Sequence, residues 1–200
     1  MAKILAINAG SSTLKWKLFS VPEETVIASG MVDRLGLPDS VFTIKKADGS
    51  KNSETKDRID AKEAAAMVLT RLKSDNIVTH LSEITGVGHR VVAGGEDFKD
   101  SVVITSQTLK KIKDLSEYAP LHNPTQAYYI EVFRDLLPKA TQVAVFDTSL
   151  YADMPKVNYL YSIPYDYYEK FGARKYGAHG TSHRYVANRT AQLLSLIHIS

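Results

Sequence analysis

The sequence predicts an α/β protein, and two observations lead to that class. Short stretches with the apolar content or alternation of β-strands dominate the first 50 residues. From residue 61 onward, stretches with helical periodicity alternate with short apolar strands. Strands followed by alternating helices and strands are typical of a sheet flanked by helices. The 200 residues, 44% hydrophobic and 24% charged, suffice for one domain or for one domain and part of a second.

The first half of the chain contains most of the predicted strands. Lys3–Ile7 is almost wholly apolar, which predicts a strand buried on both faces. Leu14–Leu18 alternates apolar residues with lysines and predicts a strand with one wet face. Two further strands are expected near Val26–Val32 and Val41–Lys46, and the charged stretch 45–60 reads mainly as a solvated loop or hairpin tip.

Helices and strands then alternate along the chain. The predicted helices are 61–74, one capped by Ser106, one capped by Asn123 with a proline in the first turn, and a last one capped by Thr181 or Ser182. The predicted strands between them are 84–92 and 142–146.

Composition excludes several classes of function. The net charge of +3 arises from dispersed lysines and arginines, so we expect no nucleic-acid groove and no membrane partner. The chain has no cysteine, which excludes disulfides, thiolate metal sites and a cysteine nucleophile. A signal peptide is not expected, and no apolar stretch has the length of a membrane span. These observations favour a cytoplasmic protein.

The turn NAGSST, residues 8–13, is the first candidate site. Its small residues and hydroxyls, with Lys15 beside them, suit a phosphate-type anion. A hydrophilic hairpin turn that faces water remains the alternative. The Walker A pattern is absent from the sequence.

Arg90 and Asp147 are candidate site residues, because Arg90 lies within a predicted apolar strand and Asp147 directly follows one. Arg90 lies in GHRVVAGGE, where a guanidinium could bind a carboxylate or phosphoryl group, or form a structural ion pair. Asp147 follows VAVF, and ligands in open α/β sheets bind beyond the carboxyl ends of strands. It could hold Mg²⁺ through water, or cap the next segment.

His179 lies in YGAHGTSH, just before the last predicted helix, where the helix N-terminus favours bound anions. His183 follows four residues later, a spacing that invites a zinc hypothesis. Gly180 interrupts the helix between them and the HExxH pattern is absent, so we do not expect zinc. His89 and His122 are expected to be hydrogen-bonded structural residues.

These segments in this order resemble the acetate kinase family, within the actin, Hsp70 and sugar-kinase superfamily. The stretches that match are INAGSSTLK, GHRVV with GGE, APLHNP, FDTS and YG with HGTSH. The resemblance implies a ribonuclease-H-like fold, a mixed sheet flanked by helices. It implies reversible Mg²⁺-dependent transfer of the ATP γ-phosphoryl group to acetate, giving acetyl phosphate and ADP. Propionate kinase resembles the chain almost equally well.

The resemblance also implies residue roles. On the nucleotide side, Asn8 would place Mg²⁺, while Lys15, Ser11 and Ser12 would contact ATP.

On the acyl side, Arg90 would bind the carboxylate or the phosphoryl group, beside an apolar wall from Val92 and Leu121. His179 would stabilise the transferred phosphoryl group. The family's usual description makes Asp147 a proton donor or acceptor. Because acetate is already an anion at neutral pH, we expect Asp147 to orient Mg²⁺ or a water instead.

Two positions depart from the family's usual residues: Ala178 stands where an aromatic is frequent, and Ala93 where histidine is frequent. Both would enlarge the acyl pocket.

The resemblance covers the chain to about residue 194, and family members are about twice as long. We therefore expect an N-terminal domain over 1–150, an incomplete nucleotide-binding domain over 151–194 and an anomalous tail over 195–200. Such a fragment is expected to be inactive alone, and the full-length protein to be a homodimer. The alternative is a non-catalytic chain that binds anions or depends on a separate partner.

Overall fold

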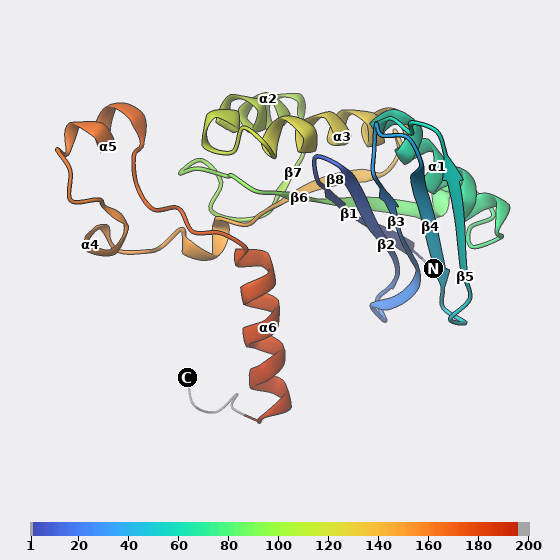
Figure 1. Ribbon diagram of the computed structural model, residues 1–200. Coiled ribbons are helices and arrows are strands. Elements are labelled where there is room, and N and C mark those ends of the chain that lie inside the picture. Colours follow the sequence, from blue (N-terminus) through green and yellow to red (C-terminus); the bar gives the residue numbers. More distant parts are fainter. Residues whose placement is uncertain (1, 196–200) are drawn as a thin grey trace.

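A computed structural model describes residues 2–195 and contains one eight-stranded mixed sheet (Figure 1). The strands are β1 (Ala2–Ala9), β2 (Thr13–Val21), β3 (Thr25–Asp33), β4 (Ser40–Lys46), β5 (Lys51–Lys56), β6 (Ile84–Val91), β7 (Val102–Val103) and β8 (Thr141–Phe146). Their order in the sheet is β5-β4-β3-β2-β1-β6-β8-β7. The first five pair antiparallel, whereas β6 runs parallel to β1 and β8 parallel to β6. The α/β prediction is confirmed.

The helices are α1 (Ala61–Ser74), α2 (Ser106–Asp114), α3 (Asn123–Leu136), α4 (Lys156–Tyr159), α5 (Asp166–Phe171) and α6 (Gly180–Leu193). The described residues also form three 3₁₀ turns, η1 (Leu81–Glu83), η2 (Leu115–Tyr118) and η3 (Ser149–Tyr151). In Figure 1, α1, α2 and α3 lie on one side of the sheet, while α6 extends from the other side. The helices α4 and α5 lie apart from the strands. Within the described residues, no helix is long and apolar enough to cross a membrane.

The main core lies between the sheet and the helices α1 and α3. Alternate residues of β1 and β2 point into it, among them Leu5, Ile7 and Leu14. Helix α1 covers them with the four residues that its periodicity predicts, Ala65, Val68, Leu69 and Leu72, all buried. A second cluster lies under α2 and α3 around Ile112, Ile130 and Phe146. Together these clusters fix the sheet edge from which the polar residues below project.

Several local predictions are wrong. The strand at Lys3–Ile7 is fully buried only on its helix face, because its other face lines a cavity. The stretch 45–60 is mostly exposed and includes the hairpin turn at 47–50, as predicted, but it also contains a strand, β5. The pairing of β5 with β4 depends on backbone bonds that the charged side chains do not reveal. Thr105 rather than Ser106 caps α2. The predicted boundary at residue 150 stays a prediction, and residues 196–200 of the predicted tail lie outside the described residues.

Candidate functional site

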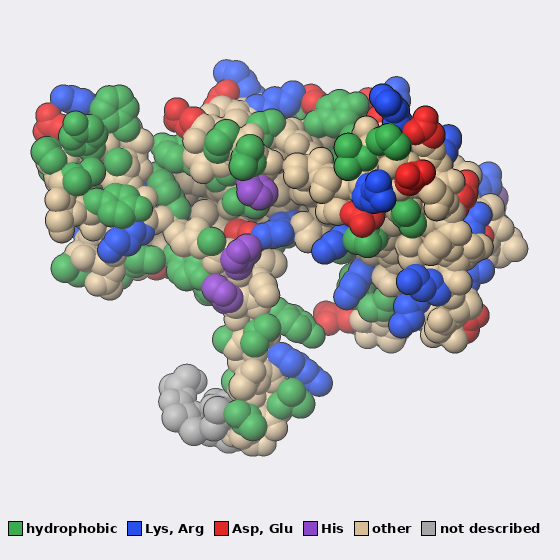
Figure 2. Space-filling model, viewed as in Figure 1, with side chains coloured by type: hydrophobic (Ala, Val, Ile, Leu, Met, Phe, Trp, Pro, Cys, Tyr) green, Lys and Arg blue, Asp and Glu red, His purple; other side chains and the backbone are tan. Residues whose placement is uncertain are grey.

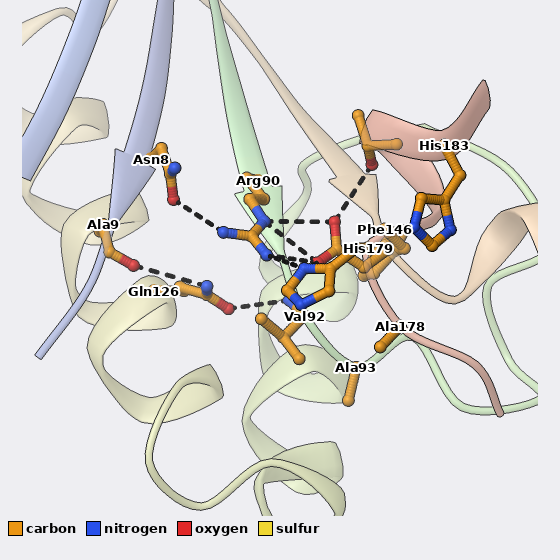
Figure 3. Close-up of polar contacts among 12 residues, drawn as sticks. Asn8, Ala9, Arg90, Val92, Ala93, Gln126, Phe146, Ala178, His179 and His183 are labelled. Carbon is orange, nitrogen blue, oxygen red and sulfur yellow. Dashed lines mark hydrogen bonds and ion pairs between the residues drawn. The ribbon is translucent and has the colours of Figure 1, made fainter. Parts of the chain in front are cut away.

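The carboxyl ends of β1, β6 and β8 bring together the polar residues predicted from the sequence. The three strands are adjacent and parallel, so their ends meet at one edge of the sheet. Asn8 lies near the end of β1, Arg90 near the end of β6, and Asp147 directly after β8. Figure 3 shows the guanidinium of Arg90 at the centre of this group.

Arg90 and Asp147 form a two-point ion pair. Arg90 Nε donates to both carboxylate oxygens at 3.2 and 3.1 Å, and Nη2 donates to Oδ2 at 2.6 Å. The Asp147 side chain is 2% exposed and the Arg90 side chain 31% exposed. Of the two sequence-based alternatives for Arg90, the structural ion pair is therefore present. It leaves part of the guanidinium accessible to a ligand.

Two further residues contact the same guanidinium. Arg90 Nη1 donates to Asn8 Oδ1 at 3.3 Å, and Nη2 lies 3.2 Å from His179 Nδ1 (Figure 3). Because an arginine only donates, His179 Nδ1 accepts this bond and the ring proton is on Nε2. The exposed Nε2–H is then free to donate to a bound oxyanion.

The start of α6 docks directly on Asp147. Gly180 N donates to the Asp147 backbone oxygen at 2.9 Å, and Thr181 Oγ1 donates to Asp147 Oδ1 at 3.2 Å. A Cβ at Gly180 would lie 2.2 Å from that backbone oxygen, so only glycine permits the approach. His179 precedes it with a φ of 54°, a left-handed conformation that is uncommon for a non-glycine residue. The prediction that Thr181 or Ser182 caps α6 is wrong, because Thr181 binds the carboxylate instead.

A cavity of about 960 Å³ adjoins this cluster on the sheet face opposite α1 and α3. Asn8, Arg90 and Thr181 line it, together with Lys15, whose strand position pairs with Asn8. Its lining also includes three further lysines, Lys17, Lys45 and Lys51. Figure 2 shows lysines and arginines over this part of the molecule. The concentration of positive charge favours an anionic ligand.

Other predicted site residues lie further from the cluster. Ser11 and Ser12 are exposed in the turn between β1 and β2 and do not line this cavity. Val92 lines a separate cavity of about 290 Å³ that also includes Ala93. Leu121 is 75% exposed and lines neither cavity, so the structure does not bring it together with Val92 as a wall.

Sequence reasoning missed a second set of residues, which holds the chain just beyond Arg90. The backbone N–H groups of residues 92, 93 and 94 are bonded by the side chains of Gln126, Asn123 and Thr148 respectively. Asn123 is therefore not the predicted cap of α3; His122 takes that place without a side-chain bond. The pattern Asn-Pro signals a helix start, and nothing in it signals a tertiary contact 30 residues away.

His89 precedes Arg90 and lies on the buried face of β6, as predicted for a structural residue. Its Nε2 lies 2.7 Å from Gln142 Oε1, and its ring packs at an angle on Phe133. Burial lowers the pKa of His89 to about 4, and the bond to Gln142 raises it by a smaller amount. His89 is therefore neutral at physiological pH. His122, by contrast, is exposed.

The residues of the cluster do not by themselves form a Mg²⁺ site. The oxygens of Asn8 and Asp147, which magnesium would need, both accept bonds from the cationic Arg90. Among residues 2–195, no three histidine or acidic side chains form a group that could hold a metal ion. The role of Asn8 in placing Mg²⁺ stays a prediction.

Comparison with known proteins identifies the family to which the chain is related. The sequence profile described as "Acetokinase family" matches residues 3–198. Acetate kinase 1 of Latilactobacillus sakei is 66% identical over 194 residues, which are 97% of this chain and 49% of that protein. Acetate kinase of Enterococcus faecalis is 59% identical over the same shares. The chain thus spans about half the length of these relatives.

Solved structures show the same family relationship. The crystal structure of Porphyromonas gingivalis acetate kinase superimposes with a TM-score of 0.90 at 41% identity, covering 98% of this chain and 49% of that one. A propionate kinase from Francisella tularensis gives 0.91 at 35% identity, covering 98% and 50%. The expected fold and the expected resemblance are confirmed: the chain belongs to the acetokinase family.

Proposed function

We propose that the whole protein transfers a phosphoryl group between ATP and acetate, and that this chain supplies the half that binds acetate and acetyl phosphate. The observation that carries the proposal is the Arg90 guanidinium, held on three sides and partly open to a basic cavity. Such a group can neutralise a carboxylate or a transferring phosphoryl group. The names of the relatives support ATP-dependent acyl phosphorylation.

Each residue then has a role that needs no proton transfer. Asp147 fixes the orientation of Arg90, since its carboxylate is already bonded to that guanidinium and to Thr181. The free Nε2–H of His179 donates to the transferring phosphoryl group. Lys15, exposed on β2 beside Asn8, adds positive charge for the ATP phosphates. ATP and Mg²⁺ enter as the co-substrate pair expected from the family.

Acetate is the preferred acid in this proposal, with propionate as the second candidate. The second candidate is favoured by the propionate kinase fold match and by Ala93, whose small side chain lines the 290 Å³ cavity beside Val92. A homodimeric full-length protein and a cytoplasmic location stay predictions.

The test is hydroxamate formation by the product of the gene that encodes this chain, expressed to its own stop codon. Acetate, ATP, Mg²⁺ and hydroxylamine should give acetyl hydroxamate, and propionate should react more slowly. The R90M variant should lose at least about 100-fold in rate, whereas R58M, a change at an arginine that is 70% exposed, should not. Wild-type protein that forms no hydroxamate, or an R90M variant as fast as R58M, would refute the proposal.

A further inference from the structure

Beyond the family site, the end of the ladder between β1 and β6 lies directly beside the anion site. Its last pair is Ile7 with His89, one residue before Asn8 and Arg90. No backbone pair between β1 and β6 joins the two positions whose side chains meet at 3.3 Å, although β1 stays paired with β2 through Ala9 and β6 with β8 through Val91. A side-chain contact can supply the direct link that the backbone ladder between β1 and β6 lacks at this end.

Gln126 of α3 occupies the place of the next rung. Its Oε1 accepts from Val92 N at 2.9 Å, and its Nε2 donates to Ala9 O at 3.5 Å, the longer and weaker of the two bonds (Figure 3). Val92 is two residues beyond Arg90, and Ala9 is one residue beyond Asn8. One carboxamide thus connects the backbone at both strand ends.

Asn123, three residues earlier on the same helix, supports this arrangement. Its Oδ1 accepts from Ala93 N at 3.0 Å, and its Nδ2 donates to Ala93 O at 3.0 Å, as a neighbouring strand would. Asn123 is 0% exposed and Gln126 is 2% exposed. Breaking the bonds of these two carboxamides would leave buried polar groups unpaired, which is costly.

We propose that Gln126 is a positioning residue of the anion site: its carboxamide replaces a rung of the β1–β6 ladder and sets the spacing between Asn8 and Arg90. The inference needs no particular substrate. Its kinetic consequence rests on the proposed phosphoryl transfer, in which a displacement of about 1 Å at Arg90 can cost on the order of 100-fold in rate.

The first test is structural and independent of turnover. In a crystal structure of the Q126M variant, the distance between Asn8 Oδ1 and Arg90 Nη1 should increase beyond hydrogen-bond range. Hydrogen exchange at the Val92 amide should become faster at the same time. An unchanged distance of 3.3 Å in that variant would overturn the inference.

The second test uses kinetics of the gene product, with Q142M as a matched control. Gln142 is a carboxamide 5% exposed in the same sheet, bonded to His89 and five residues before Asp147. Both variants should lose stability, but only Q126M should lower kcat/KM for acetate, by about 10- to 100-fold. Equal kcat/KM in Q126M and Q142M would contradict a positioning role and leave a structural one.

The Q126E variant sharpens the distinction. When protonated, its carboxyl group can accept from Val92 N and donate to Ala9 O, as the carboxamide does. Its activity relative to that of Q126M should therefore rise as the pH falls, and a constant ratio would count against the inference. Wild-type protein without acetate turnover would refute the proposed function, and the crystallographic distance would then decide the positioning role by itself.

Discussion

The ion pair between Arg90 and Asp147 predicts an asymmetry between two substitutions. R90M leaves the Asp147 carboxylate, 2% exposed, with the single bond from Thr181. Removing one partner of a buried ion pair costs roughly 3–5 kcal/mol of stability. Because Asp147 keeps its bond from Thr181, we expect R90M to cost about 3 kcal/mol, at the lower end of that range. D147N leaves the guanidinium of Arg90, whose side chain is 31% exposed and can be hydrated. Because the amide oxygen of the new asparagine can still accept one bond, D147N should cost about 1–2 kcal/mol of stability.

Urea unfolding of the 200-residue chain measures this difference, with the fluorescence of its one tryptophan, Trp16, as the probe. That side chain is 2% exposed in the main core, so its emission should change on unfolding. For a slope near 3 kcal/mol per molar urea, R90M should lower the midpoint by about 1 M and D147N by roughly half that. A D147N variant as unstable as R90M would refute the assignment of Asp147 as the desolvated partner.

Three further results are expected. Burial holds the pKa of His89 at about 4, against the ordinary 6.5, so between these pH values the unfolded chain binds a proton that the folded chain does not. The free energy of unfolding should therefore fall by up to about 3 kcal/mol from pH 6.5 to pH 4, as measured by urea unfolding, and the H89Q variant should lack this part of the decline. G180A should cost about 1–3 kcal/mol in the same assay, since its Cβ would meet the Asp147 backbone, whereas G88A, with nothing within 4 Å, should be near neutral. K15A should raise KM for ATP in the gene product with an unchanged urea midpoint; an unchanged KM would remove Lys15 from the site.

The sequence predicted those helices and strands whose packing depends mainly on their own residues. The helix Ala61–Ser74 has its apolar residues at helical spacing and Asp60 as a side-chain cap, and its predicted bounds match the structure. Arg90 and Asp147 were found because a charged residue within or directly after an apolar strand must find a partner. The identity of that partner depended on which strands are adjacent, which the sequence pattern alone does not determine.

Residues with purely tertiary roles were not predictable. Asn123 has a strong local signal as a helix cap, but its carboxamide binds Ala93 instead, because the backbone beyond β6 has no strand partner there. Thr181 was likewise expected to cap a helix, but its hydroxyl donates to Asp147 instead. Leu121, assigned to the acyl pocket through the resemblance, is exposed in this chain. Asn123 and Thr181 bind residues 30 and 34 positions away, beyond the range of local sequence patterns.

The most direct test of Arg90 as an acyl-phosphate ligand is an NMR titration of the ¹⁵N-labelled 200-residue chain with acetyl phosphate. We expect shifts at the ends of β1, β6 and β8 and at the start of α6, together with a shift of the Arg90 Nε–H signal. The R90M substitution should abolish these shifts, whereas R58M should leave them unchanged. Shifts confined to other parts of the chain, or equal binding by R90M, would contradict the claim that Arg90 forms the acyl-phosphate site.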